Sequence, residues 1–176
     1  MLRNLNIKLV PLEASDLAEF TRSLQEAFSV AVKEEFGTGD LIPSTEEIQS
    51  SIHAQGASAY VITANGKRVG GAVVKINCNS QHNSLEFFFI VPEKHSQGLG
   101  LAAWKTIEAM YPKTRVWETV TPYFEERNIH FYVNKCGFHI VEFFNPYHCN
   151  FTVDHRGKVS VDHGPTETYF RFEKVM

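Results

Sequence analysis

The stretch that decides the fold is residues 85–110, LEFFFIVPEKHSQGLGLAAWKTIEAM. It opens with an apolar run, residues 85–91, which only Glu86 interrupts. A short run so rich in aromatic and β-branched residues predicts a strand buried on both faces. A proline ends the strand, a polar loop carries Gly98 and Gly100, and the apolar spacing then becomes helical. The stretch therefore predicts a strand, a glycine-bearing turn and a helix.

The turn between this strand and helix has the properties of a phosphate site. Glycines let the backbone approach a ligand closely, and free amides at a helix start attract anions. A P-loop requires Gly, four residues and Gly-Lys-Ser/Thr, which the sequence lacks. A dinucleotide site requires the third glycine of G-x-G-x-x-G, which is also missing.

A third phosphate-binding pattern fits the turn. The run VPEKHSQGLG, residues 91–100, resembles the acetyl-CoA signature of the GNAT acetyltransferase superfamily: a strand ending in Val-x-Pro or similar, then Arg/Gln-x-x-Gly-x-Gly/Ala. His95 stands where the family usually has Arg or Gln. The resemblance implies that Ile90 and Val91 offer backbone groups to the acetyl and pantetheine arm. It also implies a pyrophosphate on the amides of six consecutive residues: Ser96, Gln97, Gly98, Leu99, Gly100 and Leu101.

A second motif follows at residues 128–138, NIHFYVNKCGF. It resembles the family's other signature, which is Asn, a helix carrying Tyr, and Lys-x-Gly-Phe. The resemblance implies that Asn128 and Lys135 help to bind the cofactor. The common form places the Tyr five residues before the Phe, whereas Tyr132 stands six residues before Phe138. One residue is about 100° around an α-helix, so this offset would turn Tyr132 away from the CoA sulfur.

Acetyl transfer to an amine defines the side chains that the site needs. An alkylammonium has a pKa of about 10.4, so a base or a water path must remove its proton. Glu86, the acid within the central strand, faces either solvent or a cleft, and burial among the neighbouring phenylalanines would raise its pKa. Glu118, in the next predicted strand, is the second candidate base. Tyr132 is either a core aromatic residue or the general acid for the leaving thiolate.

The periodicity along the chain predicts the element order β, α, α, β, β, β, α, β, α, β, β. This order indicates an α/β (α+β) fold with a mixed, mostly antiparallel central sheet and helices on both faces. It is also the GNAT order, and we expect residues 1–176 to form a single domain of that kind.

Several local signals support the order. They are capping boxes at Asp16 with Glu19 and at Ser44 with Glu47, a hairpin turn at Asn65-Gly66, and a bulge at Gly70-Gly71.

Residues 145–166 resemble an insert with its own hairpin, which turns at Arg156-Gly157. A lone hairpin is marginal in water. We therefore expect the insert to close the acceptor site, or else to join two subunits of a homodimer.

The composition and charge of the chain limit the classes of partner that it can bind. The chain is 43% hydrophobic and 21% charged, with a net charge of −3 and no basic block, which argues against nucleic acid. No apolar stretch reaches about 18 residues and no signal core opens the chain, so we expect a cytoplasmic protein with no membrane partner. No metal is expected, because the spacing of four possible ligands matches no zinc pattern: His148, Cys149, His155 and His163.

Together these patterns predict a cytoplasmic N-acetyltransferase that uses acetyl-CoA as co-substrate. The acetyl group would pass by direct transfer in a ternary complex to the primary amine of a small molecule or peptide. Two alternatives stay open: a non-catalytic CoA-binding sensor or interaction module, and transfer of a longer acyl group. The residue pattern does not identify the acceptor.

Overall fold

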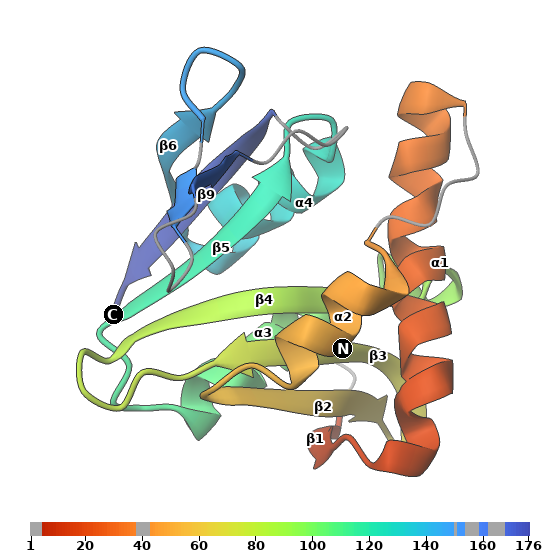
Figure 1. Ribbon diagram of the computed structural model, residues 1–176. Coiled ribbons are helices and arrows are strands. Elements are labelled where there is room, and N and C mark those ends of the chain that lie inside the picture. The colour runs from red at the N-terminus through yellow and green to blue at the C-terminus, as the bar shows by residue number, and fades with distance from the viewer. Residues whose placement is uncertain (1–4, 38–42, 150, 154–158, 162–167) are drawn as a thin grey trace. The chain divides into compact units, whose positions relative to one another are not determined.

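The computed structural model describes residues 5–37, 43–149, 151–153, 159–161 and 168–176 (Figure 1). The chain divides into two compact units, one formed by residues 1–117 with Met176 and the other by residues 118–175. Within the described ranges, no helix combines the length and apolar character needed to cross a membrane.

The first unit contains an antiparallel sheet in which each strand pairs with the next along the chain. Its strands are β1 (Ile7–Pro11), β2 (Ala57–Ala64), β3 (Lys67–Lys75) and β4 (His82–Ile90). Its helices are α1 (Leu17–Phe36), α2 (Thr45–Ile52) and α3 (Leu99–Met110), with short 3₁₀ turns η1 (Ala14–Asp16) and η2 (Pro92–Lys94). The predicted turn between β2 and β3 is present, and Asn65 and Gly66 both have positive φ, as a tight hairpin requires.

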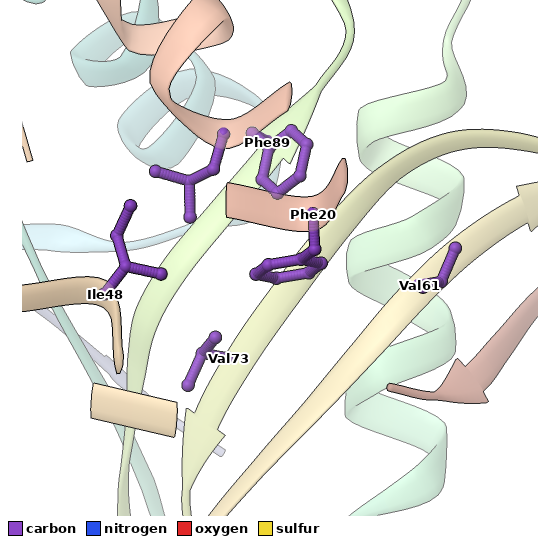
Figure 2. Close-up of a cluster of buried hydrophobic side chains, with 6 residues drawn as sticks. Phe20, Ile48, Val61, Val73 and Phe89 are labelled. Carbon is purple, nitrogen blue, oxygen red and sulfur yellow. The ribbon is translucent and has the colours of Figure 1, made fainter. Parts of the chain in front are cut away.

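Helices cover both faces of this sheet. Figure 2 shows the cluster on one face, where α1 and α2 pack on strands β2, β3 and β4. Its buried members are Phe20, Leu24, Ile48, Val61, Val73 and Phe89. Helix α3 lies behind the same strands in Figure 1 and buries Ala103, Trp104 and Ile107. The mixed α/β class with a mostly antiparallel sheet is thus confirmed.

The two glycines of β3 have a different role from the predicted bulge. The register shift falls one residue earlier, since Ile62 pairs with Gly70 and Thr63 pairs with Arg68. A Cβ at Gly71 would lie 2.7 Å from the ring of Phe89 and closer still to the ring of Phe20. Gly71 therefore makes room for this edge-to-face pair of rings, whose centroids are 5.4 Å apart.

One of the two predicted capping boxes forms. Ser44 accepts from the Glu47 amide at 3.2 Å, and Glu47 accepts from the Ser44 amide at 2.7 Å. Asp16 makes no cap, because its backbone is already helical after η1. Instead, Asp16 and Glu19 accept hydrogen bonds from Arg68 at 2.7 and 2.9 Å. The predicted cap at Asp16 was therefore wrong, and its two acids tie α1 to β3.

In the second unit, β9 (Tyr169–Val175) lies between β5 (Val116–Pro122) and β6 (His139–Phe144), and pairs antiparallel with β6. The sequence predicted one helix from about residue 124 to 135. The structure has a short helix, α4 (Glu126–His130), which continues into a π-helix, η3 (Phe131–Cys136).

The expected insert contains a small hairpin. Strand β7 (Phe151–Val153) pairs antiparallel with β8 (Val159–Val161), with Phe151 opposite Val161. The predicted turn at Arg156-Gly157 lies outside the described residues, as do His155 and His163. Ahead of the hairpin, Asn145 and His148 exchange backbone hydrogen bonds of 3.1 and 2.9 Å, which make a tight turn after β6.

Candidate active site

Strand β4 carries a bulge at Glu86. Val73 pairs with Phe87 and Val74 pairs with Leu85, which leaves Glu86 without a partner across the strands. The side chain of Glu86 is exposed and accepts a hydrogen bond from the hydroxyl of Ser84. The sequence allowed Glu86 to face either solvent or a cleft. Its exposed side chain shows that Glu86 is not buried among the phenylalanines.

The end of β4 presents a backbone peptide on its side away from β3. The amide of Val91 donates to the carbonyl of Val69 at 2.9 Å, and Ile90 is paired with Gly70. Hydrogen-bonded and non-hydrogen-bonded pairs alternate along an antiparallel ladder. The N–H and C=O of Ile90 consequently point away from β3, and the C=O accepts a hydrogen bond from Nε2 of His95.

The turn after β4 forms as the glycine pattern predicted. Ser96 and Gly98 both adopt positive φ, at 61° and 76°, and Gly98 is the N-cap of α3. The first bond of this helix runs from the Ala102 amide to the Gly98 carbonyl at 3.2 Å. The amides of Leu99, Gly100 and Leu101 precede that bond, so they lack acceptors within the helix and can bind an anion.

The second motif contains the π-helix η3, whose wider turn changes the helical phase of Tyr132 relative to Phe138. The amide of Gly137 donates to the carbonyl of Tyr132, five residues back, where an α-helix would use the residue four back. This wider turn absorbs one additional residue. Tyr132 is buried, with its ring 5.5 Å from that of Phe138 and 5.8 Å from that of Phe172, so it is a core aromatic residue of the second unit.

The hydroxyl of Tyr132 is strongly perturbed by its surroundings. Burial raises the pKa of Tyr132 well above its ordinary value, and the nearby thiol of Cys136 adds to this increase. A hydrogen bond with Thr119 opposes the increase and gives the phenol a polar partner inside the second unit. The group is therefore a protonated phenol at neutral pH.

The two other candidates of this motif lie at its surface. Asn128 is half-buried on α4, and its carbonyl accepts from the amide of Phe131. Lys135 is exposed in the last turn of η3, which places a cation near the negative end of that helix. Both are accessible to a ligand.

Glu118, the second candidate base, is held in an ion-pair network. Its carboxylate accepts a 2.9 Å hydrogen bond from Arg171, which also contacts Glu142 and Glu173. A base must take up a proton, and protonation of Glu118 would weaken its pair with Arg171. The network thus makes Glu118 less suitable than Glu86.

Sequence reasoning did not find a hollow of about 110 Å³ beside α1 in the first unit. It is lined by Asp16, Glu19, Phe20, Ser23, Val61, Arg68, Gly70, Phe89 and Val91. Pockets that bury a whole ligand start at about 300 Å³, so this one admits only a few atoms. Its charged wall joins residues 52 positions apart, and no local signal in the sequence reveals such a pairing.

These features agree with the comparisons to known proteins. Residues 18–138 match the model of the Acetyltransferase (GNAT) family. The chain belongs to this family, and it is an acyltransferase, an acetyl-CoA-dependent N-acetyltransferase. This membership favours the catalytic hypothesis over a binding module.

One curated relative is similar over nearly the whole chain. The uncharacterized protein YrkN of Bacillus subtilis (strain 168) is 56% identical over 167 residues, which cover 92% of this chain and 89% of YrkN.

Solved structures share the fold at low identity. An acetyltransferase from Thermus thermophilus has a TM-score of 0.68 at 16% identity and covers 97% of both chains. The ribosomal-protein-S18-alanine N-acetyltransferase of Escherichia coli has a TM-score of 0.67 at 16% identity, covering 96% of this chain and 93% of its own. Spermidine N-acetyltransferase from Vibrio cholerae, in complex with CoA and spermine, has a TM-score of 0.65 at 15% identity, covering 96% and 95%.

Proposed function

We propose that the protein transfers an acetyl group from acetyl-CoA to the primary amine of a small molecule or peptide, directly and within a ternary complex. The observation that carries this proposal is the end of β4. There the outward peptide of Ile90 is followed by a turn whose amides open helix α3. Backbone groups at the end of a strand, next to an anion site, suit a ligand with an amide-bearing arm and phosphates.

In this proposal the turn binds the pyrophosphate through the amides of residues 96–101. The backbone of Ile90 holds the pantetheine arm. Val91 was expected to share this role, but its amide donates to Val69 and its carbonyl accepts from Lys94, so Val91 shapes the end of the strand. Asn128 and Lys135 add polar contacts. Bound acetyl-CoA supplies the thioester whose carbonyl carbon the amine attacks.

Glu86 removes the proton of the attacking ammonium, directly or through one water. Its exposure and its position in a bulge support this role, because a bulge changes the direction in which a side chain points. As the new C–N bond forms and the C–S bond breaks, the thiolate takes a proton from Tyr132. Because burial raises the pKa of Tyr132, the phenol carries its proton at neutral pH, and this hydroxyl is the donor that the proposal assigns to the thiolate.

Direct transfer needs no acyl-enzyme. Cys136, the thiol of the second motif, is buried on the side of η3 that packs into the second unit. A thiol in such a place serves packing rather than attack on a thioester.

The acceptor class rests on what the proposed chemistry requires, which is an amine that can lose a proton. The similar structures named above include an enzyme for a protein's alanine and one for spermidine. An amine acceptor is common to both. We propose that this chain also acts on an amine, of a small molecule or a peptide, and that it uses no nucleic acid, membrane or metal.

Release of free thiol from acetyl-CoA with a panel of amines tests this function. We expect turnover with at least one amine, and Glu86→Gln should lower kcat roughly tenfold to a hundredfold near pH 7. The loss should shrink as pH rises toward about 10, where the amine deprotonates unaided. Glu26→Gln, an exposed acid in α1, is the control. Binding of CoA without turnover for any amine would contradict the proposal.

We further propose that the insert at residues 145–166 closes the acceptor site of a single-domain enzyme. The alternative is that it joins two subunits. A two-stranded hairpin such as β7–β8 needs a surface to pack on. Replacing residues 150–163 by a short Gly-Ser loop should raise the KM of the acceptor and leave the mass in solution unchanged. A fall from dimer to monomer supports the subunit interface, and no change in either measurement contradicts both roles.

A further inference from the structure

The side chain of His95 reaches back from the phosphate-binding turn to the end of β4. Its Nε2 atom lies 2.6 Å from the carbonyl oxygen of Ile90, in a half-buried position. Between these two residues the backbone makes the 3₁₀ turn η2, with the Lys94 amide bonded to the Val91 carbonyl at 2.9 Å. The hydrogen bond from the imidazole therefore ties the end of the η2 segment back to the last residue of β4.

The chemistry of this contact specifies the proton. A carbonyl oxygen only accepts hydrogen bonds, so Nε2 must carry the hydrogen. Both the Nε2–H neutral form and the imidazolium satisfy this requirement. A carbonyl oxygen also has two lone pairs, which leaves Ile90 able to accept a second donor.

We propose that His95 is a positioning residue that holds the phosphate-binding turn against β4 for acetyl-CoA. This inference rests on the proposed function, in which Ile90 contacts the pantetheine arm and residues 96–101 contact the pyrophosphate. The hydrogen bond from His95 to the Ile90 carbonyl links the strand end to the start of the phosphate-binding turn. Ser96, the next residue, has a left-handed φ of 61°, which is unfavourable for a side-chain-bearing residue. A fixed His95 keeps the turn in this conformation before the ligand arrives, so less ordering is needed on binding.

Two variants separate the hydrogen bond from the shape of the side chain. Gln keeps an N–H donor of comparable reach, whereas Leu has none. We expect His95→Leu to raise the Kd for CoA and the KM for acetyl-CoA about five- to tenfold, with kcat within about twofold. His95→Gln should stay within about twofold of the wild type in all three. Melting temperatures confirm that both variants fold.

The measurements are calorimetric CoA titrations, steady-state kinetics and the ¹⁵N NMR shifts of the His95 ring. A ring protonated at Nε2 is expected. A ring with its only hydrogen on Nδ1, an unchanged or lower Kd in His95→Leu, or equal losses in both variants would overturn the inference. Wild-type protein that fails to bind CoA would overturn the proposed function, and this inference with it. Wild-type binding with an unaffected His95→Leu variant overturns the inference alone.

Discussion

The turn after β4 and the α4–η3 segment carry the two family signatures, and they tolerate departures from those signatures in different ways. The turn has His95 at the place of Arg or Gln, yet its backbone forms the glycine N-cap and the amide-bearing helix start. The α4–η3 segment has a tyrosine one residue early, and there the backbone itself changes, from α-helix to π-helix.

The difference follows from which atoms each motif uses. In the proposed function the turn binds through main-chain amides, so another side chain at position 95 can serve as long as it holds the backbone in place. In the proposed function the α4–η3 segment acts through one phenol, whose direction depends on helical phase. An additional residue would rotate that phenol, and the wider turn of η3 absorbs it. Backbone function therefore tolerates substitution, whereas side-chain function requires a correction of register.

The largest effect is expected from a side chain placed among the amides of the turn. Gly100→Glu puts a carboxylate in the first turn of α3, beside the proposed pyrophosphate. We expect the Kd for CoA to rise at least about a hundredfold in calorimetry, because the new carboxylate would repel the negatively charged pyrophosphate of CoA.

Ala109→Glu is the matched control, because it adds the same charge at the exposed other end of α3. An acid stabilises a helix N-terminus and destabilises its C-terminus. Loss of stability should therefore be greater in the control, while loss of CoA affinity should be confined to Gly100→Glu. Equal CoA affinities in the two variants would remove the turn from the binding site.

Much of the turn and little of the α4–η3 geometry was predictable from sequence. The β2–β3 hairpin, the Ser44–Glu47 capping box and the Gly98 turn depend on residues a few positions apart, so local chemistry decides them. The outcome at Asp16 depends on Arg68, far along the chain. The π-turn depends on how much Tyr132 gains from packing in the second unit, and a helical periodicity that assumes 3.6 residues per turn cannot show it.

Between the two motifs, the second effect in size is expected from the phenol itself. Tyr132→Phe keeps the ring among its aromatic neighbours and removes the hydroxyl. We expect kcat to fall about tenfold at neutral pH. The loss is modest because the thiolate of a thiol with a pKa of about 8.5 is a good leaving group. Tyr147→Phe, at a fully exposed tyrosine, should leave kcat unchanged.

The same variant has a pH signature in stability. Burial raises the folded-state pKa of Tyr132 above the unfolded value near about 10, so folding favours the protonated phenol. That contribution is complete below about pH 10 and is lost as pH rises through the folded-state pKa. The Tm of wild type should therefore fall more steeply above about pH 10 than the Tm of Tyr132→Phe. Parallel curves would show that the hydroxyl is not buried as described.

The smallest effect is expected from a change that looks drastic, the deletion of Asn134. This residue is exposed within η3, and its side chain contacts His130 at 3.0 Å. Deletion leaves Tyr132 five residues before Phe138 and lets the π-turn relax to an α-turn with the tyrosine in the same direction. We expect kcat within about threefold of wild type and a retained Tyr132 signature in the alkaline Tm curve.

Deletion of Lys105, an exposed residue of the regular helix α3, is the control. There no additional residue is stored, so the rest of the helix rotates by about 100° and carries Ile107 out of the core. If both deletions unfold the protein, η3 is not a compensated insertion, and the comparison between the two motifs loses its physical basis.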